Sequence, residues 1–201
     1  MKTTKILGEI MATVASKILL TPEDYLLMER EAEFKSEYRN GKIVAMPRAN
    51  RQHNLITGNI LCGFHRQLLE QTDEVYTNIM RIKVSDSGLY TYPDVVVVCN
   101  EPRFEDSYFD TLLNPTVIVE VLSPSTETYD RNDKFLSYQT LASLQEYILV
   151  SQKGVGVEQY VRQNGTWILR EFQSLEDVLQ LASIECSLAL RAIYAKVKFL
   201  R

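Results

Sequence analysis

Two carboxylates occupy positions where an ionised side chain is costly. Residues 116–122 read Thr-Val-Ile-Val-Glu-Val-Leu, so Glu120 shares one face of a predicted strand with aliphatic side chains, while valines fill the other face. Asp94 follows a proline and opens the run of four valines at residues 95–98. An ionised carboxylate in such surroundings costs several kcal/mol unless it is protonated, paired with a cation or bound to a metal.

The two carboxylates together predict a bound cation. If Asp94 and Glu120 lie on neighbouring strands, their charges repel each other, which raises one pKa unless a cation lies between them. Hard divalent ions prefer carboxylate, carbonyl and water oxygens as ligands. The pair therefore predicts a site for Mg2+ or Mn2+.

A cationic partner is expected on the helix that follows. Asp130, Lys134 and Tyr138 are four residues apart and share one helix face, from which Lys134 can point toward the strand ends. In phosphodiester hydrolysis a metal lowers the pKa of its bound water and neutralises charge on the phosphoryl oxygens. A lysine can orient the nucleophile or stabilise the charge of the transition state. The two carboxylates and the lysine suit these roles.

Each of these residues also has a structural interpretation. Glu120 could form a buried ion pair with Lys134, or with Arg81 across the sheet. Asp94 could be a turn residue after a proline. His53, at the start of a predicted helix, either contacts a phosphate or acts as a base, or is a helix-start histidine with satisfied hydrogen bonds. The presence of two carboxylates together favours the metal site.

Periodicity and turn residues predict the elements that position these side chains. Asn-Gly pairs at residues 40–41 and 164–165 predict two tight hairpins. Helices are expected at residues 22–31, 54–70 and 130–141, and strands at 76–84, 93–99, 116–122, 146–151, 156–162 and 167–172. The strands at 93–99 and 116–122 are expected in the centre of the sheet, because both of their faces are apolar.

Length and charge are those of an ordinary globular chain. The 201 residues predict one domain over residues 21–201, preceded by an N-terminal extension over residues 1–20. The net charge of -4 and the pI near 5.3 provide no overall attraction for phosphate backbones, so any contact with nucleic acid must be local. Three widely spaced cysteines and no signal or membrane segment predict a cytoplasmic protein without a membrane partner.

Three segments form a family signature. They are Tyr-Pro-Asp-Val-Val-Val-Val at residues 92–98, Val-Ile-Val-Glu-Val-Leu-Ser-Pro-Ser-Thr at residues 117–126, and Asp130 with Lys134-Phe135 and Tyr138. With these segments the chain resembles the Uma-type bacterial family of restriction-endonuclease-like proteins, in the PD-(D/E)XK superfamily. The resemblance implies an α/β (α+β) fold with a restriction-endonuclease-like core, in which helices flank a mixed β-sheet.

The resemblance also implies roles for single residues. Asp94 matches the aspartate after the proline, and Glu120 matches the acidic residue of the second half-motif. The carbonyl of Val121 would be a further metal ligand. Glu37 would be an outer carboxylate.

The expected function is hydrolysis of phosphodiester bonds in nucleic acid, with DNA expected rather than RNA, by a divalent-metal-dependent nuclease. The pattern has a lysine at position 122, where this chain has leucine. The family's usual explanation moves that lysine to the following helix, here Lys134. The departure and the acidic net charge favour a rival, a non-catalytic binding or assembly module that retains the fold and its acidic pocket. A homodimer is expected, formed through the apolar residues 184–194 or the long loop at 100–115.

Overall fold

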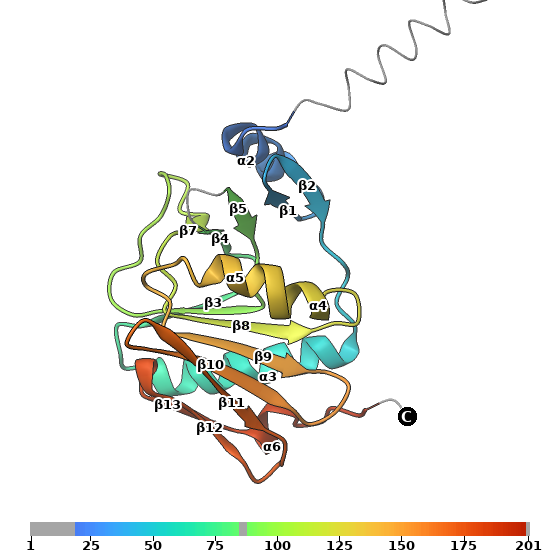
Figure 1. The fold of residues 1–201 in the computed structure, drawn as a ribbon, viewed down its shortest axis with the longest axis vertical. Coiled ribbons are helices and arrows are strands. Elements are labelled where there is room, and N and C mark those ends of the chain that lie inside the picture. Colours follow the sequence, from blue (N-terminus) through green and yellow to red (C-terminus); the bar gives the residue numbers. More distant parts are fainter. Residues whose placement is uncertain (1–18, 85–87, 200–201) are drawn as a thin grey trace, which may run out of the picture. The chain divides into compact units, whose positions relative to one another are not determined.

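The computed structural model describes residues 19–84 and 88–199, so most of the expected extension over residues 1–20 lies outside the described residues. The described residues fall into two compact units, which are divided between Met46 and Pro47; Figure 1 labels the elements of both. The expectation of a single domain over residues 21–201 stays a prediction.

Within residues 19–46, the first unit contains one helix and one hairpin. Its elements are α2 (Pro22–Glu31), β1 (Ser36–Arg39) and β2 (Lys42–Ala45). The helix begins at a capping box, in which the Thr21 hydroxyl accepts the Asp24 N–H at 3.1 Å. β1 and β2 pair antiparallel, and Asn40 and Gly41 at their turn have φ angles of 48° and 84°. The hairpin predicted from the Asn-Gly pair is confirmed.

A six-stranded mixed sheet forms the centre of the second unit, in the order β11-β10-β9-β8-β6-β3. Its strands are β3 (Glu74–Thr77), β6 (Val95–Val98), β8 (Val117–Leu122), β9 (Glu146–Ser151), β10 (Val157–Gln163) and β11 (Thr166–Phe172). β8 and β9 run parallel, and the other neighbours are antiparallel. β6 and β8 are buried over their whole length, as expected for the two most apolar strands.

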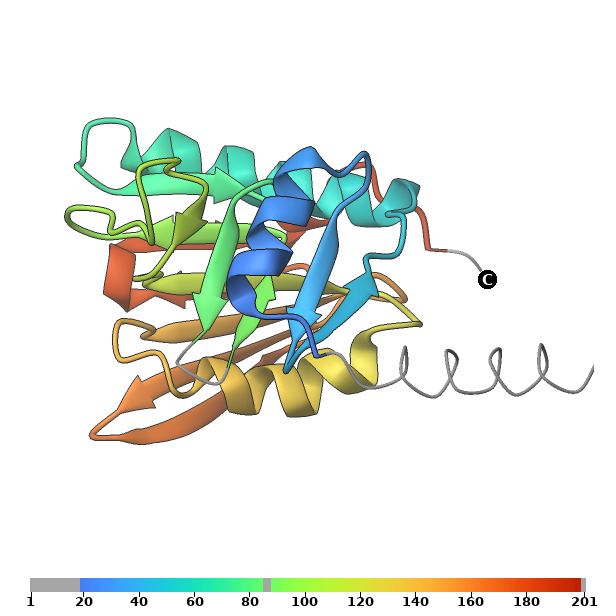
Figure 2. The same cartoon turned by 90° about the horizontal axis from the view of Figure 1, so that it is seen from above.

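Helices cover both faces of this sheet. α3 (Arg51–Leu68) packs on one face through residues such as Ile56, Ile60 and Phe64. The other face is covered by a helical segment that consists of α4 (Glu127–Tyr129), a π-helical turn (Asp130–Lys134) and α5 (Phe135–Tyr138). Figure 2 shows α3 and α4–α5 on opposite sides of the strands. This arrangement confirms the predicted fold class, a mixed sheet flanked by helices.

The remaining elements of the second unit are shorter. They are β4 (Arg81–Val84), β5 (Leu89–Thr91), β7 (Thr111–Leu112), β12 (Val178–Leu181), a 3-10 helix (Ala182–Ile184), β13 (Cys186–Ala189) and α6 (Leu190–Ile193). The single strand predicted at residues 76–84 is wrong. The Met80 N–H donates to the Thr77 carbonyl at 2.9 Å, and this turn separates β3 from β4, which pairs with β5 and β7 instead.

The C-terminal apolar segment is part of the chain's own core. Ile184, Leu190 and Ile193 are at most 2% exposed and pack in the cluster that α3 covers. The segment at residues 184–194, which the sequence offered as an interface, therefore has no large apolar surface left for a neighbouring molecule. Across residues 19–84 and 88–199, none of the helices combines the length and the apolar character needed to cross a membrane.

Candidate active site

The sheet brings the two predicted carboxylates together. Asp94 directly precedes β6, and the antiparallel register pairs Val95 with Val119. Continued by one residue, this register places Asp94 opposite Glu120 on the same face of the sheet. Residues directly opposite in an antiparallel pair have Cβ atoms roughly 4.5–5.5 Å apart. Both side chains are buried, with 8% and 5% exposure, so their charges interact in a medium that screens them weakly.

Asp94 is held by one of its two oxygens. Its Oδ2 accepts the Val121 backbone N–H at 2.8 Å and lies 3.1 Å from His53 Nε2. The second contact comes from the first turn of α3, on the other side of the sheet. Together the two contacts fix the direction in which the second oxygen of Asp94 points.

A proline leaves one backbone carbonyl of the site without a ladder partner. The register that pairs Asp94 with Glu120 places Pro93 opposite Val121. Because the Val121 N–H points toward Asp94, its carbonyl points to the same edge of β8. Pro93 has no N–H to donate to that carbonyl. The Val121 carbonyl, implied by the family resemblance as a ligand, thus faces the Asp94 side.

His53 is positioned by the start of α3. The Asn50 side chain caps this helix by accepting the His53 N–H at 2.9 Å, and the first turn contains no acidic residue. The His53 ring reaches Thr57 with Nδ1, at 3.4 Å, and Asp94 with Nε2. In this position the imidazole orients the aspartate. Its predicted role as a base or phosphate contact stays a prediction.

Glu120 lies in a buried charge cluster with Lys134. Its Oε1 accepts from Lys134 Nζ and from the Tyr138 hydroxyl, both at 2.8 Å. Lys134 Nζ also lies 3.5 Å from Asp130 Oδ1. Lys134 and Asp130 are 4% and 3% exposed. The face formed by Asp130, Lys134 and Tyr138 is therefore directed at Glu120, as their spacing predicted.

The environment of Glu120 favours its protonated form. Burial is the main cause that raises its pKa from 4.5 to about 8, and the negative charges of Asp130 and Asp94 add to it, while Lys134 acts in the opposite direction. In the protein without metal this carboxyl thus keeps its proton to a higher pH than an ordinary glutamate does. A divalent cation beside Glu120 would replace that proton, because it supplies positive charge to the same buried group.

The alternative partner of Glu120, Arg81, is engaged elsewhere. Its guanidinium donates to the Thr111 hydroxyl at 2.9 Å and to the Tyr92 hydroxyl at 3.0 Å, and it lies 2.9 Å from Asp110. Glu37 belongs to the first unit, where its carboxylate pairs with Arg39. Its expected role as an outer carboxylate stays a prediction.

The π-helical turn is a part of the site that the sequence did not reveal. It spans Asp130–Lys134, so both buried charges that flank Glu120 lie at its ends. Such turns insert one residue into a helix and are frequent at functional sites. The four-residue spacing signalled a shared face but gave no sign of the extra residue. The contribution of Tyr138 was also missed, although the same spacing placed it on that face.

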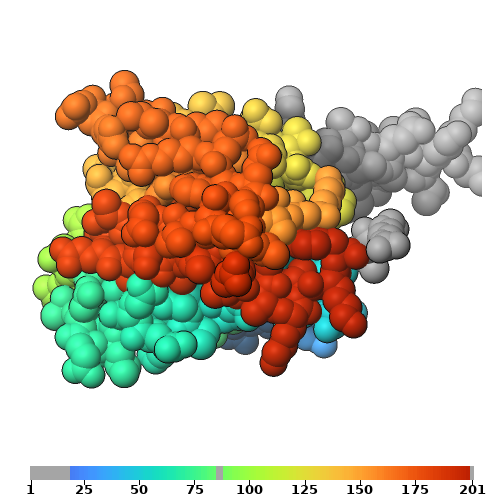
Figure 3. All heavy atoms as spheres, turned by 90° about the horizontal axis from the view of Figure 1, so that it is seen from below, coloured from blue at the N-terminus to red at the C-terminus, as the bar shows by residue number. Residues whose placement is uncertain are grey.

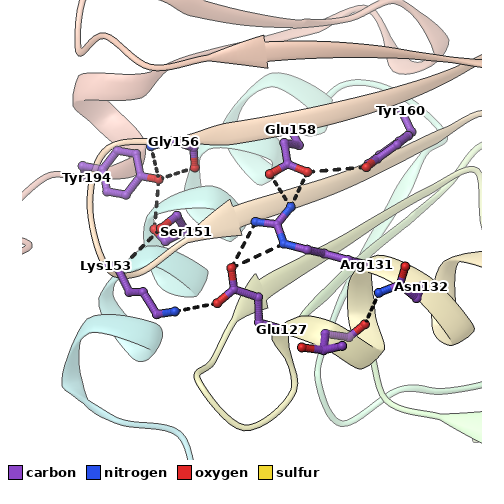
Figure 4. Close-up of polar contacts among 10 residues, drawn as sticks. Glu127, Arg131, Asn132, Ser151, Lys153, Gly156, Glu158, Tyr160 and Tyr194 are labelled. Atoms are coloured by element: carbon purple, nitrogen blue, oxygen red, sulfur yellow. Dashed lines mark hydrogen bonds and ion pairs between the residues drawn. The ribbon is translucent and has the colours of Figure 1, made fainter.

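A solvent-facing network holds this turn in place (Figure 4). Lys153 Nζ lies 2.6 Å from Glu127, and Arg131 contacts both Glu127, at 3.3 Å, and Glu158. These ion pairs tie α4 and the turn to the β9–β10 connection, whose Gly156 N–H donates to the Tyr194 hydroxyl at 3.0 Å. Because the Arg131 side chain is anchored toward solvent, the two buried charged residues at the ends of the turn, Asp130 and Lys134, are directed toward Glu120.

The donor atoms fit a hard divalent ion. Across the described ranges, the hydrogen bonds and ion pairs of the two carboxylates use Asp94 Oδ2 and Glu120 Oε1. The other oxygen of each carboxylate is thereby left for an ion. With the Val121 carbonyl they form an all-oxygen set, as Mg2+ and Mn2+ prefer. No group of three or more His, Cys, Asp or Glu residues suited to a metal occurs within residues 19–84 and 88–199. A resident ion must therefore take further ligands from water or substrate.

Comparisons with known proteins identify a family and a shared fold. The Uma2 family, described as "Putative restriction endonuclease", matches residues 22–192. Two uncharacterized proteins of Synechocystis sp., sll1609 and slr1290, are each 36% identical to this chain; the matches cover 80% and 90% of this chain and 92% and 94% of theirs. The crystal structure of a "putative nuclease belonging to DUF820" from Anabaena variabilis has a TM-score of 0.72 at 20% identity, over 88% of this chain and 98% of that chain. This likeness shows a shared fold.

Proposed function

This chain belongs to the Uma2 family, and from that premise we propose that it is a divalent-metal-dependent nuclease that hydrolyses phosphodiester bonds of nucleic acid, with DNA as the expected substrate. One observation carries the proposal. Asp94 and Glu120 are buried opposite each other on one sheet face, and each is held by one oxygen while the other is left for an ion.

The proposed ligands are the carboxylates of Asp94 and Glu120 and the carbonyl of Val121. When bound, Mg2+ or Mn2+ would supply a polarised water and positive charge for the phosphoryl oxygens. His53 holds the Asp94 carboxylate in one orientation, and Tyr138 does the same for Glu120. The side chains around the site are thus fixed before substrate arrives, which lowers the cost of reorganisation during the reaction.

Lys134 is the proposed source of positive charge from the protein. Its ammonium contacts Glu120 and Asp130, so it lies beside the place where a phosphate would approach the carboxylates. There it can hold a water molecule by hydrogen bonding and stabilise negative charge that develops on phosphoryl oxygens. Glu37 remains a proposed outer carboxylate. A cytoplasmic location is proposed too, and the free thiols of Cys62, Cys99 and Cys186 are compatible with a reducing compartment.

The rival function is a binding or assembly module without turnover. The observation that favours it is the 2.8 Å pair between Lys134 and Glu120, because a neutralised buried pair is stable without any metal. The two functions differ in one measurable property. A nuclease requires the ion, whereas the module is indifferent to it.

The test is metal-dependent nicking of supercoiled DNA by purified protein, with single-stranded RNA as a second substrate. We expect nicking with Mn2+ or Mg2+, none with a chelator, and a loss of about 100-fold or more in Lys134→Met, which keeps the side-chain volume. Lys153→Met is the matched control, because this exposed lysine pairs with Glu127 on the same helical segment and should retain activity. A folded wild type that leaves both substrates intact would favour the assembly module. Activity that survives in Lys134→Met would show that Lys134 is not the lysine on which nicking depends.

A further inference from the structure

β11 is an unusually open edge of the six-stranded sheet. It pairs with β10 over all seven of its residues, from Thr166 opposite Gln163 to Phe172 opposite Val157, and it is the last strand in the sheet order. Both of its faces are accessible, since Ile168 is 41% exposed and Leu169 is 45% exposed. Figure 3 shows the β10–β11 hairpin, in orange, open to the viewer beside the red C-terminal strands. In the described part of the chain, no strand lies beyond β11.

The edge lacks the usual protection against pairing with another chain. Natural edge strands are kept apart by charged side chains, above all lysine, and by proline, bulges or short length. β11 contains no lysine and no proline, its two charged residues, Arg170 and Glu171, have opposite signs, and its register with β10 is unbroken. The opposite edge, β3, has only four residues. A long, regular and partly apolar edge is expected to be covered in solution.

We propose that β11 pairs antiparallel with β11 of a second copy of this chain, so that two six-stranded sheets join across a twofold axis. The occupant follows from the strand's own sequence. A twofold axis perpendicular to the sheet leaves each side chain on the same face of the joined sheet. Two residues that lie opposite each other across the axis must therefore both be odd-numbered or both even-numbered. This rule limits the registers to those centred on a single residue.

Length and charge select one of these registers. Centring on Leu169 pairs all seven residues, with Thr166 opposite Phe172 and Leu169 opposite its own copy. Centring on Arg170 or Glu171 would place two like charges directly opposite each other, which is unfavourable. Centring on Ile168 would leave the last two residues of β11 without strand partners. The Leu169 register therefore combines the longest ladder, an apolar centre and no facing like charges.

The proposed β11 interface replaces one of the two surfaces expected from the sequence and is an alternative to the other. The large apolar side chains of residues 184–194 are buried within the chain, so the expected homodimer needs a different interface. The loop at residues 100–115 exposes Tyr108 and Phe109, which are 68% and 65% accessible, and it provides a rival surface and a control. The proposed pairing does not depend on the nuclease function, because no residue of the candidate active site lies in β11.

A charge-complementation experiment tests both the interface and its register. The chain has a mass of 23.1 kDa, and sedimentation of the wild type should give twice that mass at micromolar concentration. Leu169→Lys places two like charges opposite each other at the axis and should raise the dimer dissociation constant by about tenfold or more. Leu169→Glu should do the same. A mixture of the two variants should recover the dimer, because opposite charges then face each other.

The outcomes are decisive in both directions. Recovery in the mixture also shows that the two variants are folded, so a failure to fold cannot imitate the result. Tyr108→Lys should leave the mass unchanged. A monomeric wild type, a dimer that persists in Leu169→Lys, or a monomeric Tyr108→Lys protein would each overturn the proposed interface. A mixture that stays monomeric would overturn the register centred on Leu169.

Discussion

Two buried glutamates on neighbouring strands differ in what holds them. Glu120 on β8 and Glu146 on β9 are 5% and 1% exposed. Glu146 Oε1 accepts the N–H and the hydroxyl of Ser183, at 2.9 and 2.8 Å, and its Oε2 accepts from Gln159 Nε2 at 2.5 Å. Glu120 uses only Oε1, for a lysine and a tyrosine.

The difference separates a structural carboxylate from one suited to chemistry. Both oxygens of Glu146 are saturated by neutral donors that belong to β10 and the segment after β12, so this glutamate ties elements together and has no oxygen left to bind an ion. Glu120 is opposite Asp94 and is surrounded by charges that a cation can rebalance. Burial alone therefore does not identify a reactive carboxylate, whereas the chemistry of its partners does.

The largest expected difference between the two glutamates is in catalysis. Glu120→Gln removes a proposed metal ligand and should reduce metal-dependent nicking by about 100-fold or more. Glu146→Gln should retain activity per folded molecule, because this side chain contacts no residue of the candidate site. The measurement is the rate of plasmid nicking, corrected for the folded fraction by circular dichroism. Equal losses in the two variants would remove the distinction.

Metal binding should stabilise the protein through the Glu120 end of the sheet. An ion at a hundredfold excess over its dissociation constant contributes about 2.7 kcal/mol, so saturating Mn2+ should raise the wild-type melting temperature by roughly 5–10 °C. Asp94→Asn relieves repulsion with Glu120 and should melt at or above the wild type without metal, yet gain little from Mn2+. Thermal melts from micromolar to millimolar Mn2+ measure both effects. A flat wild-type response would contradict the metal site.

Substitution of the other glutamate, Glu146, should lower the stability of the protein. Glu146→Gln puts an amide NH2 group where Ser183 or Gln159 donates, which leaves buried donors unpaired and should cost about 1–3 kcal/mol. The melting temperature should fall by roughly 2–4 °C for each kcal/mol. Glu120→Gln, measured beside it in chelator at pH 8, should melt at or above the wild type, because it replaces a buried carboxylate by a neutral group. A variant at position 146 that melts like the wild type would show that these hydrogen bonds contribute little.

The last expected difference is a dependence of stability on pH. Since the pKa of Glu120 is about 8 in the folded protein and 4.5 is its ordinary value, only the folded chain holds this proton between those values. This contribution to stability is complete below pH 4.5 and is lost as pH rises through about 8, by at most about 1.4 kcal/mol per pH unit. Denaturant melts in chelator should therefore give a free energy of unfolding that declines as pH rises for the wild type. The decline should be smaller in Glu120→Gln. Parallel curves for the two proteins would exclude Glu120 as its cause.

Local chemistry explains what the sequence predicted well. The Asn-Gly pairs define both hairpins, and at the second one Asn164 and Gly165 have φ angles of 49° and 81°. The apolar residues on both faces of β6 and β8 identified the central strands, and within them Asp94 and Glu120 stood out as carboxylates among aliphatic residues. These features depend on neighbouring residues alone, so they can be inferred before the fold is known.

The missed features depend on contacts between distant segments. The turn between β3 and β4 contains neither glycine nor proline, so residues 76–84 resembled one strand. His53 meets Asp94 only after α3 packs across the end of the sheet. The burial of residues 184–194 follows from packing against α3, which their apolar composition could not distinguish from an interface.

Leu122 and Lys134 have a consequence for how this site can be recognised in a sequence. Leu122 lies two residues after Glu120, so both side chains emerge on the same sheet face, where Leu122 is buried at 4% exposure. A lysine at either position 122 or position 134 could therefore reach the same carboxylate. In this chain the helix carries the lysine, and the strand position belongs to the core. A search that requires an acidic residue and a lysine two positions apart would therefore overlook this chain, although a buried lysine lies 2.8 Å from the same carboxylate.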